Sequence, residues 1–323
     1  MELKQLRTLL AVAETGSVTR AAQLLHVVQS AVTKQVRTLE SELGVDLFQR
    51  TRQGMITTDA GQILIASARR VISDLERTET EVRQQKDAVQ GTVRIGILDS
   101  VTDLVAEPLV ARLSRTHPQI DLQITTAFAG HLREWLYEGL LDASILFGVS
   151  DPGAVRVTPI ATEKLWAMAP RDVGLSDVKP ITVRDVAAHP LIVPARGHAL
   201  RTLIDEATAR AHVEPRISVQ VNASRLAMRL VAGGHGWTIL PAVCFTYGDV
   251  AATLSMAPLD DPQAVRDLIL ASPRSHRPAP ATQVVTNALL GLLREAAQDG
   301  SWPSVNWRAD APATGHSPVR RGN

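Results

Sequence analysis

Four polar or basic side chains near the N-terminus recur at spacings that put them on one face of a predicted helix over residues 29–43. They are Ser30, Thr33, Lys34 and Arg37. Residues three and four apart share a helix face, and the opposite face is an apolar stripe: Val32, Val36, Leu39 and Leu43. Hydroxyls and long cations together can donate hydrogen bonds to the phosphates and base edges of DNA. The face therefore predicts contact with DNA, and the alternative interpretation is a solvated face without a partner.

Two predicted elements before this helix would position it. An apolar pattern predicts a helix over residues 3–15, and Ser17 stands where a side chain caps the start of a second short helix, which ends near His26. No acidic residue occurs between Thr15 and Leu39, so positive charge is concentrated here. Two helices joined by a tight turn are the geometry that lays a recognition helix in the major groove of DNA.

A β-hairpin around a Gln-Gly turn is predicted over residues 47–58. Arg50 and Arg52 lie two apart, so both would point to the same side of a strand, where they can straddle phosphates or enter a minor groove. Phe48 is assigned to the small apolar core. The hairpin is interpreted as a wing that adds DNA contacts to those of the helices.

The N-terminal stretch closely resembles the LysR-type transcriptional regulators. The segments that carry the resemblance are 17–27, 29–43, 44–51 and the sequence Thr58-Asp59-Ala60-Gly61. The resemblance is specific in its order over about the first 65 residues and looser further along. It implies a winged helix-turn-helix that binds DNA as a dimer, a long linker helix, and a two-lobed effector domain related to periplasmic binding proteins.

The chain departs from the family pattern at the start of the recognition helix. The family has Ser or Thr followed by Gln-Pro where this chain has Val28, Gln29 and Ser30. Valine cannot cap a helix, which costs about 1 kcal/mol unless Ser30 or a neighbouring residue supplies the cap. The phosphate contact expected at residue 28 is missing, while Ser30 can donate its own hydroxyl to the DNA backbone. The full set of predicted DNA-binding residues is Arg20, Gln29, Ser30, Thr33, Lys34, Arg37, Arg50 and Arg52.

From Asp59 to Val89 the sequence has no proline and one glycine, which predicts a single helix of about 30 residues. A heptad pattern with steps of four and three runs along it: Leu64, Ala68, Val71, Leu75, Thr78, Val82, Gln85 and Val89. We expect this helix to pair two copies of the chain as a coiled-coil homodimer, although Thr78 and Gln85 weaken the seam. The alternative is a long helix that packs on its own domain.

Beyond Gly91 the patterns of strands and helices alternate, which predicts a parallel sheet with helices on its faces. Strands are expected at 92–98, 122–126, 143–147, 190–194, 217–221, from 237, and at 267–271. Helices are expected at 105–113, 133–141, 200–211, 223–232 and 282–297. The predicted fold class is a multidomain α+β protein with an N-terminal winged helix-turn-helix, a long linker helix and a two-lobed α/β effector domain of the periplasmic-binding-protein type.

These patterns also predict the domain boundaries. They are 1–58 for the winged helix-turn-helix, 59–90 for the linker helix that dimerises, 91–300 for the effector domain and 301–323 for a disordered tail rich in Pro, Gly and Ser. The two-crossover arrangement of the family implies a first lobe over about 91–161 and 268–300 and a second lobe over about 162–267.

In such sheets, ligands bind beyond the carboxyl ends of the strands, where helix N-termini present free amide groups. The predicted effector-binding residues in the loops there are Ser100, Thr102, Phe128, Arg196, His198 and Asn222. Hydroxyls at a helix start that face Arg196 from the other lobe would suit a small carboxylate. For Ser100 and Thr102 the alternative is helix capping alone. Arg196 can instead form a salt bridge with Asp205 or Glu206.

The composition fits a globular protein of more than one domain. The chain has 323 residues, of which 45% are hydrophobic and 21% charged, and its formal net charge is +1. The net charge therefore does not by itself indicate a polyanionic partner such as nucleic acid. The N-terminus lacks the apolar core of a signal peptide, and no apolar run approaches the roughly 20 residues of a membrane span. The single cysteine, Cys244, suits a reducing compartment. We expect a cytoplasmic protein without a membrane partner.

The sequence shows no HExxH, GxSxG or GxxxxGK[ST] pattern, and its nine histidines lack metal-ligand spacing. We therefore expect no enzyme activity and no metal or cofactor other than a small-molecule co-inducer. The sequence predicts a ligand-responsive transcriptional regulator whose effector cleft biases DNA bending. Its expected partners are double-stranded DNA, further copies of itself in a dimer or tetramer, RNA polymerase and the effector. The alternatives are an effector-independent regulator of the same family and a two-lobed small-molecule-binding protein or enzyme.

Overall fold

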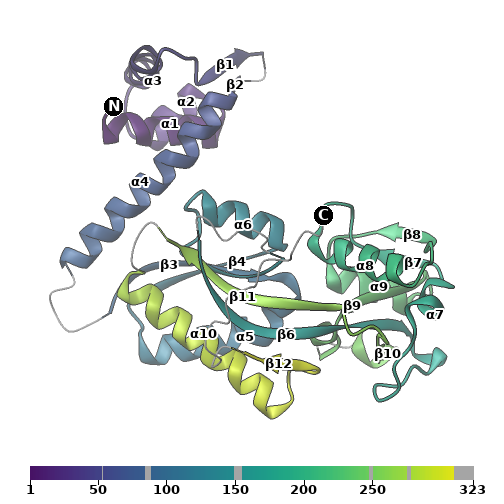
Figure 1. The fold of residues 1–323 in the computed structure, drawn as a ribbon. Helices are drawn as coiled ribbons and strands as arrows, with labels where there is room; N and C mark the ends of the chain where they lie inside the picture. The colour runs from purple at the N-terminus through teal and green to yellow at the C-terminus, as the bar shows by residue number, and fades with distance from the viewer. Residues whose placement is uncertain (53, 84–88, 149–154, 247–249, 275–277, 309–323) are drawn as a thin grey trace, which may run out of the picture. The chain divides into compact units, whose positions relative to one another are not determined.

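The computed structural model describes residues 1–52, 54–83, 89–148, 155–246, 250–274 and 278–308. The chain forms two compact units (Figure 1). The first comprises Met1–Ala88 with Trp135–Leu140, and the second comprises Val89–Glu134 with Leu141–Asn323. Within the described ranges, no helix has the length and apolar character needed to span a membrane.

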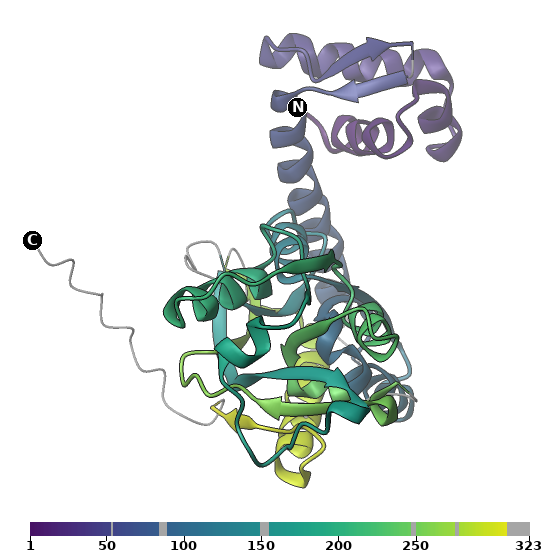
Figure 2. The same ribbon diagram turned by 90° about the vertical axis from the view of Figure 1, so that its right-hand side faces the viewer.

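The first unit is a helical cluster with a two-stranded wing. Its elements are α1 (Leu3–Thr15), α2 (Val18–Leu24), α3 (Gln29–Leu43), β1 (Phe48–Thr51), β2 (Gly54–Thr57) and α4 (Asp59–Arg83). Apolar side chains from all four helices and from β1 form one core, which includes Leu9, Val12, Ala21, Leu39 and Phe48. Figure 2 shows β1 and β2 as a pair of antiparallel arrows among these helices. This is the winged helix-turn-helix predicted from the sequence.

Helix α4 buries a different face from the one that the heptad pattern predicts. Ile65, Ala68 and Ile72 are buried in the core of the first unit, and α1 packs against α4. The predicted seam is wrong at Ala68, because this residue fills the core of its own unit. Val71 of the seam is exposed. Gln85 lies outside the described residues.

The second unit is built on a ten-stranded sheet that extends through two lobes, in the order β4-β3-β5-β11-β6-β9-β7-β8 with β10 and β12 paired to β6. The first lobe contains β3 (Gly91–Leu98), α5 (Asp99–Thr116), β4 (Ile120–Ala127), the start of α6 (Ala129–Tyr137) and β5 (Ala143–Phe147). The second lobe contains α7 (Val183–Ala187), β7 (Leu191–Val193), α8 (Ala199–Arg210), β8 (Ile217–Gln220), α9 (Ser224–Ala232), β9 (Trp237–Pro241) and β10 (Leu254–Pro258). In each lobe the first three strands are parallel, as predicted.

Two long antiparallel strands connect the lobes, and Figure 1 shows both of them running through the unit. They are β6 (Val155–Pro170) and β11 (Val265–Pro273). They pair along the first part of β6, up to Lys164 opposite Val265. From Leu165 onward, β6 pairs with β9 and β10 instead. Helix α10 (Pro280–Asp299) returns to the first lobe, where it packs against α5 and β3.

The predicted disordered tail is wrong for residues 301–308. Trp302 is 1% exposed, and its backbone N–H donates to the carbonyl of Ala296 in α10 at 2.9 Å. Its indole Nε1 donates to the buried carboxylate of Glu163 at 3.1 Å. The strand β12 (Val305–Trp307) then pairs antiparallel with β6. Burial of this indole and the pairing of β12 order the start of a tail whose Pro, Gly and Ser content over residues 301–323 is typical of disorder. Residues 309–323 lie outside the described residues.

The indole bond to Glu163 makes a prediction about stability. Trp302→Phe keeps the apolar ring in place but removes one donor from a buried carboxylate, so it should lower the free energy of unfolding by about 1.5–3 kcal/mol. Trp307→Phe, on the same segment with its ring against Arg294, is the matched control and should cost about 0.5 kcal/mol or less. Urea unfolding measures both. Equal losses in the two variants would contradict the role of the indole N–H.

Candidate functional site

The solvent-facing side of α3 carries the cations and hydroxyls predicted to meet DNA. Lys34 and Arg37 are exposed and Thr33 is half-buried, and the three line a shallow groove along the helix. The opposite stripe is buried at three of its four predicted positions: Val32, Val36 and Leu39. The fourth, Leu43, is exposed at the last residue of the helix. The core thus turns Lys34 and Arg37 outward.

The turn between α2 and α3 leaves the start of α3 without a side-chain cap. Val28 is the N-cap residue, it is 68% exposed, and its side chain makes no capping hydrogen bond. His26 closes the turn with a φ of 55°. By contrast, Ser17 caps α2 by accepting from the backbone N–H of Arg20 at 3.4 Å, as predicted. The recognition helix therefore begins less well stabilised than the helix before it.

Three further predicted DNA residues are exposed around this turn: Arg20, Gln29 and Ser30. The guanidinium of Arg20 donates to the carbonyl of Thr15 at the end of α1. A contact between Arg20 and DNA would therefore replace a bond that the side chain already makes within its own unit. Gln29 and Ser30 occupy the first two positions of α3.

The wing places its two arginines differently. Arg50 lies on β1 opposite Met55 of β2, whereas Arg52 follows the end of β1 in the turn. The prediction that both point to the same side of one strand is wrong for Arg52, because the pairing ends at Thr51 and Gly54. Both arginines are exposed.

Two contacts fix the wing to the helices. Met55 donates its backbone N–H to the carbonyl of Gly16 at 2.9 Å. A Cβ on Gly54 would lie 2.5 Å from that same oxygen, and Gly54 has a φ of 129°, so only glycine fits there. From the other side, Glu40 of α3 accepts from the backbone N–H of Leu47 at 2.9 Å. The wing and the exposed face of α3 therefore belong to one rigid surface.

The second unit contains a cleft between its two lobes, at the carboxyl ends of β3, β4, β7 and β8. The cavity in this cleft has a volume of about 30 Å³, room for about two water molecules, so a ligand that needs the roughly 300–1,000 Å³ of a small-molecule site would require the lobes to move apart. Its lining is largely apolar and includes Leu98, Phe128, Phe147, Val193 and Leu240. The position is the one expected for a ligand site in a sheet of this kind.

Arg266 lines the cleft and forms a buried ion pair with Glu163, the two side chains being 2% and 0% exposed. Its Nε donates to Glu163 Oε2 at 2.9 Å, and its Nη1 donates to Ser100 Oγ at 2.9 Å. Glu163 also accepts from the backbone N–H of Val243 and from the indole of Trp302. The positive charge of Arg266 is therefore balanced inside the protein.

The sequence analysis missed this pair. The predicted last strand began at Asp267, one residue after Arg266, and no strand was predicted around Glu163. The available signal was one acid and one base at positions that alternate with buried apolar residues: Glu163 between Ala161 and Leu165 in β6, and Arg266 two residues before Leu268 in β11. Side chains of this kind are almost never fully buried unless they are paired.

The structure brings four of the six predicted effector residues to the cleft: Ser100, Phe128, His198 and Asn222. Thr102 does not line it, because its Oγ1 donates back to the carbonyl of Leu98 at 3.0 Å within the first turn of α5. Arg196 does not line it either, because it lies exposed in the loop after β7.

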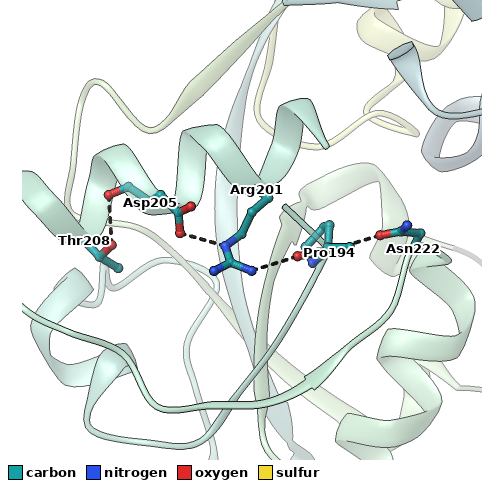
Figure 3. Close-up of polar contacts among 6 residues, drawn as sticks. Pro194, Arg201, Asp205, Thr208 and Asn222 are labelled. Carbon is teal, nitrogen blue, oxygen red and sulfur yellow. Dashed lines mark hydrogen bonds and ion pairs between the residues drawn. The ribbon is translucent and has the colours of Figure 1, made fainter. Parts of the chain in front are cut away.

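Arg201 bonds to Pro194 and Asp205 (Figure 3), and Pro194 lies two residues before Arg196 in the same loop. The Nη1 of Arg201 donates to the carbonyl of Pro194 at 3.1 Å, and its Nε donates to Asp205 at 2.7 Å. The backbone N–H that follows Pro194 donates to Asn222 Oδ1 at 2.8 Å. The salt bridge proposed between Arg196 and Asp205 is thus made by Arg201 instead.

A carboxylate of the first lobe reaches into the second. Asp99 begins α5, and its Oδ2 accepts from the backbone N–H of Ser224, which begins α9, at 3.1 Å. One turn further along α5, Asp103 pairs with Arg225. A negative charge is favourable at a helix N-terminus because it meets unpaired amides and the positive end of the dipole. Asp99 therefore joins the two lobes at the cleft.

His198 presents a neutral imidazole to the cleft. Burial, followed by the positive charge of Arg266, lowers the pKa of His198 to about 4. Its Nδ1 caps α8 by accepting from the backbone N–H of Leu200 at 3.1 Å. The ring packs edge-on against Phe128, with centroids 4.7 Å apart. His198 is thus a positioning and packing group at neutral pH.

The uncapped start of α3 predicts a stabilising substitution. Val28→Ser supplies the missing acceptor and should raise the free energy of unfolding by about 1 kcal/mol. Val45→Ser makes the same chemical change at another exposed position, outside any helix, and should give no gain. Urea unfolding of the two variants measures the difference. No gain from Val28→Ser would show that the turn already satisfies these amides.

The lowered pKa of His198 predicts a pH dependence of stability. Between the ordinary histidine pKa of 6.5 and about 4, His198 is protonated in the unfolded chain but not in the folded chain. The free energy of unfolding therefore falls as the pH drops through this window. His198→Asn keeps a capping oxygen but cannot titrate. The stability of the wild type relative to this variant should therefore be greater at about pH 7 than at about pH 5. A His198 ring that titrates near 6.5 by NMR would contradict this.

Known proteins resemble the chain along most of its length. It is 29% identical to the HTH-type transcriptional regulator BbuR of Bordetella bronchiseptica over 293 residues, 90% of either chain. Full-length OxyR from Pseudomonas aeruginosa matches with a TM-score of 0.71 and 24% identity, over 91% of this chain and 95% of that one. CbnR in complex with its target DNA matches with a TM-score of 0.65 and 22% identity, over 92% and 100% of the two chains. The two structures share the fold of this chain.

Family models match both units. The model described as "Bacterial regulatory helix-turn-helix protein, lysR family" matches residues 3–62, and the model described as "LysR substrate binding domain" matches residues 86–294. These matches set aside the alternative of a two-lobed binding protein or enzyme whose N-terminal segment only dimerises it. The chain belongs to the LysR family of DNA-binding transcriptional regulators.

Proposed function

We propose that the chain reads operator DNA with α3 in the major groove and with the wing on the flanking backbone. The observation that carries the proposal is the polar and basic side of α3, turned to solvent opposite a buried apolar stripe. Lys34 and Arg37 supply the cations for base edges and phosphates. The proposed DNA-binding set is Arg20, Gln29, Ser30, Thr33, Lys34, Arg37, Arg50 and Arg52, within a DNA-binding domain over 1–58 and before a linker over 59–90.

The linker helix α4 supports pairing of two copies. Ile63 and Val71 are 72% and 47% exposed, and both lie outside the face that Ile65 and Ile72 bury in the core. Exposed apolar residues on a long helix are what a coiled-coil partner covers. Two copies would present two recognition helices to half-sites about one helical turn or more apart. A tetramer would be a pair of such dimers.

The cleft of the second unit is the proposed effector site. Ser100, Phe128, His198 and Asn222 stay in the proposed set, and Arg266 and Asp99 join it because both line the cleft. The alternative, a regulator that needs no effector, predicts that no small molecule changes operator affinity or DNA bending.

A thiol-based response is a poor rival to effector binding. Cys244 is buried, and burial raises the pKa of its thiol to about 12. The thiolate is the reactive form of cysteine, so this residue is protonated at neutral pH and unreactive.

The proposed mechanism couples the two sites mechanically. An effector in the cleft favours one orientation of the lobes, which are linked by β6 and β11. In an assembled dimer or tetramer, this orientation sets the spacing of the winged domains and hence the bend of the DNA between half-sites. RNA polymerase then meets a promoter of altered shape. The bacterial cytoplasm is the compartment in which such a regulator would act.

Substitutions on the proposed DNA face test this function. Arg37→Ala and Arg50→Ala should each weaken operator binding by about tenfold or more, because each removes a charge-assisted contact of about 1–3 kcal/mol. The slope of log affinity against log salt should become shallower by about one where a phosphate contact is lost. Fluorescence anisotropy with labelled operator measures both quantities.

Arg115→Ala is the matched control, since it removes an equal charge from an exposed position at the end of α5. Its affinity should stay within about twofold of the wild type. Unchanged affinity in both Arg37→Ala and Arg50→Ala would mean that DNA is read by another surface.

A further inference from the structure

We propose that the cleft selects an uncharged effector, an apolar molecule with a polar group that both donates and accepts hydrogen bonds, as a carboxamide does, and that it rejects carboxylates. This inference rests on the proposed role of the cleft as the effector site. It reverses the expectation built on Arg196, which does not line the cleft. Of the groups there that could hold an anion, Arg266 and the start of α9 are already occupied by carboxylates of the protein, and His198 carries no charge.

The cationic group on the cleft wall is the first of these. Arg266 is the arginine that lines the cleft, and Glu163 takes its Nε at 2.9 Å and lies 2.7 Å from its Nη2. With the Glu163 side chain 0% exposed, solvent cannot screen the negative charge that balances the guanidinium. A ligand carboxylate at Arg266 would share that cation with a second buried anion, and like charges held close together in a dry site strongly disfavour joint ionisation.

The amide-rich helix start is the second. The N-terminus of α9 lines the cleft at Ser224, and Asp99 already accepts from the backbone N–H of Ser224 at 3.1 Å. This carboxylate occupies the position at which the dipole and free amides of α9 would attract an anionic ligand. A ligand carboxylate would have to displace Asp99 or lie beside it.

The third ionisable side chain of the lining, His198, supplies no positive charge at neutral pH. His198 stays neutral at pH 7 because burial and Arg266 lower its pKa to about 4. Because Glu163 balances the charge of Arg266 and His198 is neutral, the negative charge of Asp99 is the one that no charged residue of the lining balances. An apolar wall that includes Phe128 and Phe147 then makes an unpaired ligand anion costly to desolvate.

Two groups with unused capacity define what the ligand offers instead. Among the described residues, no acceptor lies in hydrogen-bonding geometry with Nη2 of Arg266, although its ion-pair contact with Glu163 is short. A carbonyl oxygen would satisfy this buried donor. Asp99 can accept further hydrogen bonds, because a carboxylate has about four acceptor sites. Ser100 follows Asp99 in the chain and accepts from Nη1 of Arg266, so the guanidinium and the Asp99 carboxylate both lie at the start of α5.

Matched probes test the charge preference directly. Benzamide and benzoate have nearly the same shape and differ in charge, so their affinities for the full-length chain, without DNA, are compared by ligand-observed NMR. The wild type should bind benzamide about tenfold or more tighter than benzoate. Asp99→Asn keeps an oxygen for the amide of Ser224 while removing the excess charge, and it should improve benzoate binding by about tenfold. Glu107→Gln, an exposed position on the same helix that does not line the cleft, should leave both affinities unchanged.

Each outcome decides the proposal. Benzoate binding by the wild type that equals or exceeds benzamide binding overturns it. If neither probe binds the wild type measurably, benzoate binding gained by Asp99→Asn alone upholds it, and no gain overturns it. Operator affinity is measured separately on the same preparation. If the wild-type chain does not bind operator DNA, the proposed function is contradicted. The ratio of the benzamide and benzoate affinities still tests the charge preference of the cleft.

Discussion

The buried pair of Glu163 and Arg266 constrains the whole effector unit. Removing one ion from water without its partner costs several kcal/mol, so every group that satisfies the pair must stay in place. The pair and these groups together come from five separate parts of the chain: β6, β11, the start of α5, the segment after β9 and the C-terminal segment. Glu163 and Arg266 lie on β6 and β11, the strands that connect the lobes, and Arg266 also lines the cleft. A change in how the two strands are arranged would therefore also move a side chain of the cleft wall.

This constraint shapes what the cleft can recognise. An arginine on the wall of a binding site usually marks an anion site, but here its charge is balanced by Glu163 and one hydroxyl contact fixes it to Ser100. What it offers a ligand is an oriented donor. Asp99 offers an acceptor and bonds the second lobe, so a ligand that engages both groups also acts on the contact between the lobes. Recognition and lobe orientation therefore depend on the same few bonds.

Elements dominated by local sequence could be predicted. The apolar stripe of α3, the cap at Ser17 and the assignment of Phe48 to the core depend on helical period, one hydrogen bond between near neighbours and side-chain size. The structure agrees with each except at the last stripe position, Leu43, which is exposed. The loops that carry Ser100, Phe128 and Asn222 followed from a rule about strand ends, and these residues do line the cleft.

The features that escaped prediction depend on partners distant in the sequence. Arg266 meets Glu163 across 103 positions and Trp302 meets Glu163 across 139, so no local pattern reveals either contact. Ala68 fits the heptad pattern, yet its side chain is buried in the core of its own unit. Arg52 falls in the turn because strand pairing ends one residue earlier than the alternation indicates. For Arg266, Trp302 and Ala68, contacts with residues distant in the sequence decided the structure; for Arg52, the point at which the hairpin pairing ends decided it.

The account depends most on sequence-specific DNA binding by the first unit. The most direct measurement is selection of fragmented genomic DNA by the purified full-length chain at about 150 mM salt, where most nonspecific binding is lost, followed by sequencing of the bound fragments. The account predicts a small set of enriched sites, each with two related half-sites separated by about one or more helical turns. Recovery of fragments without any enriched sequence would contradict it.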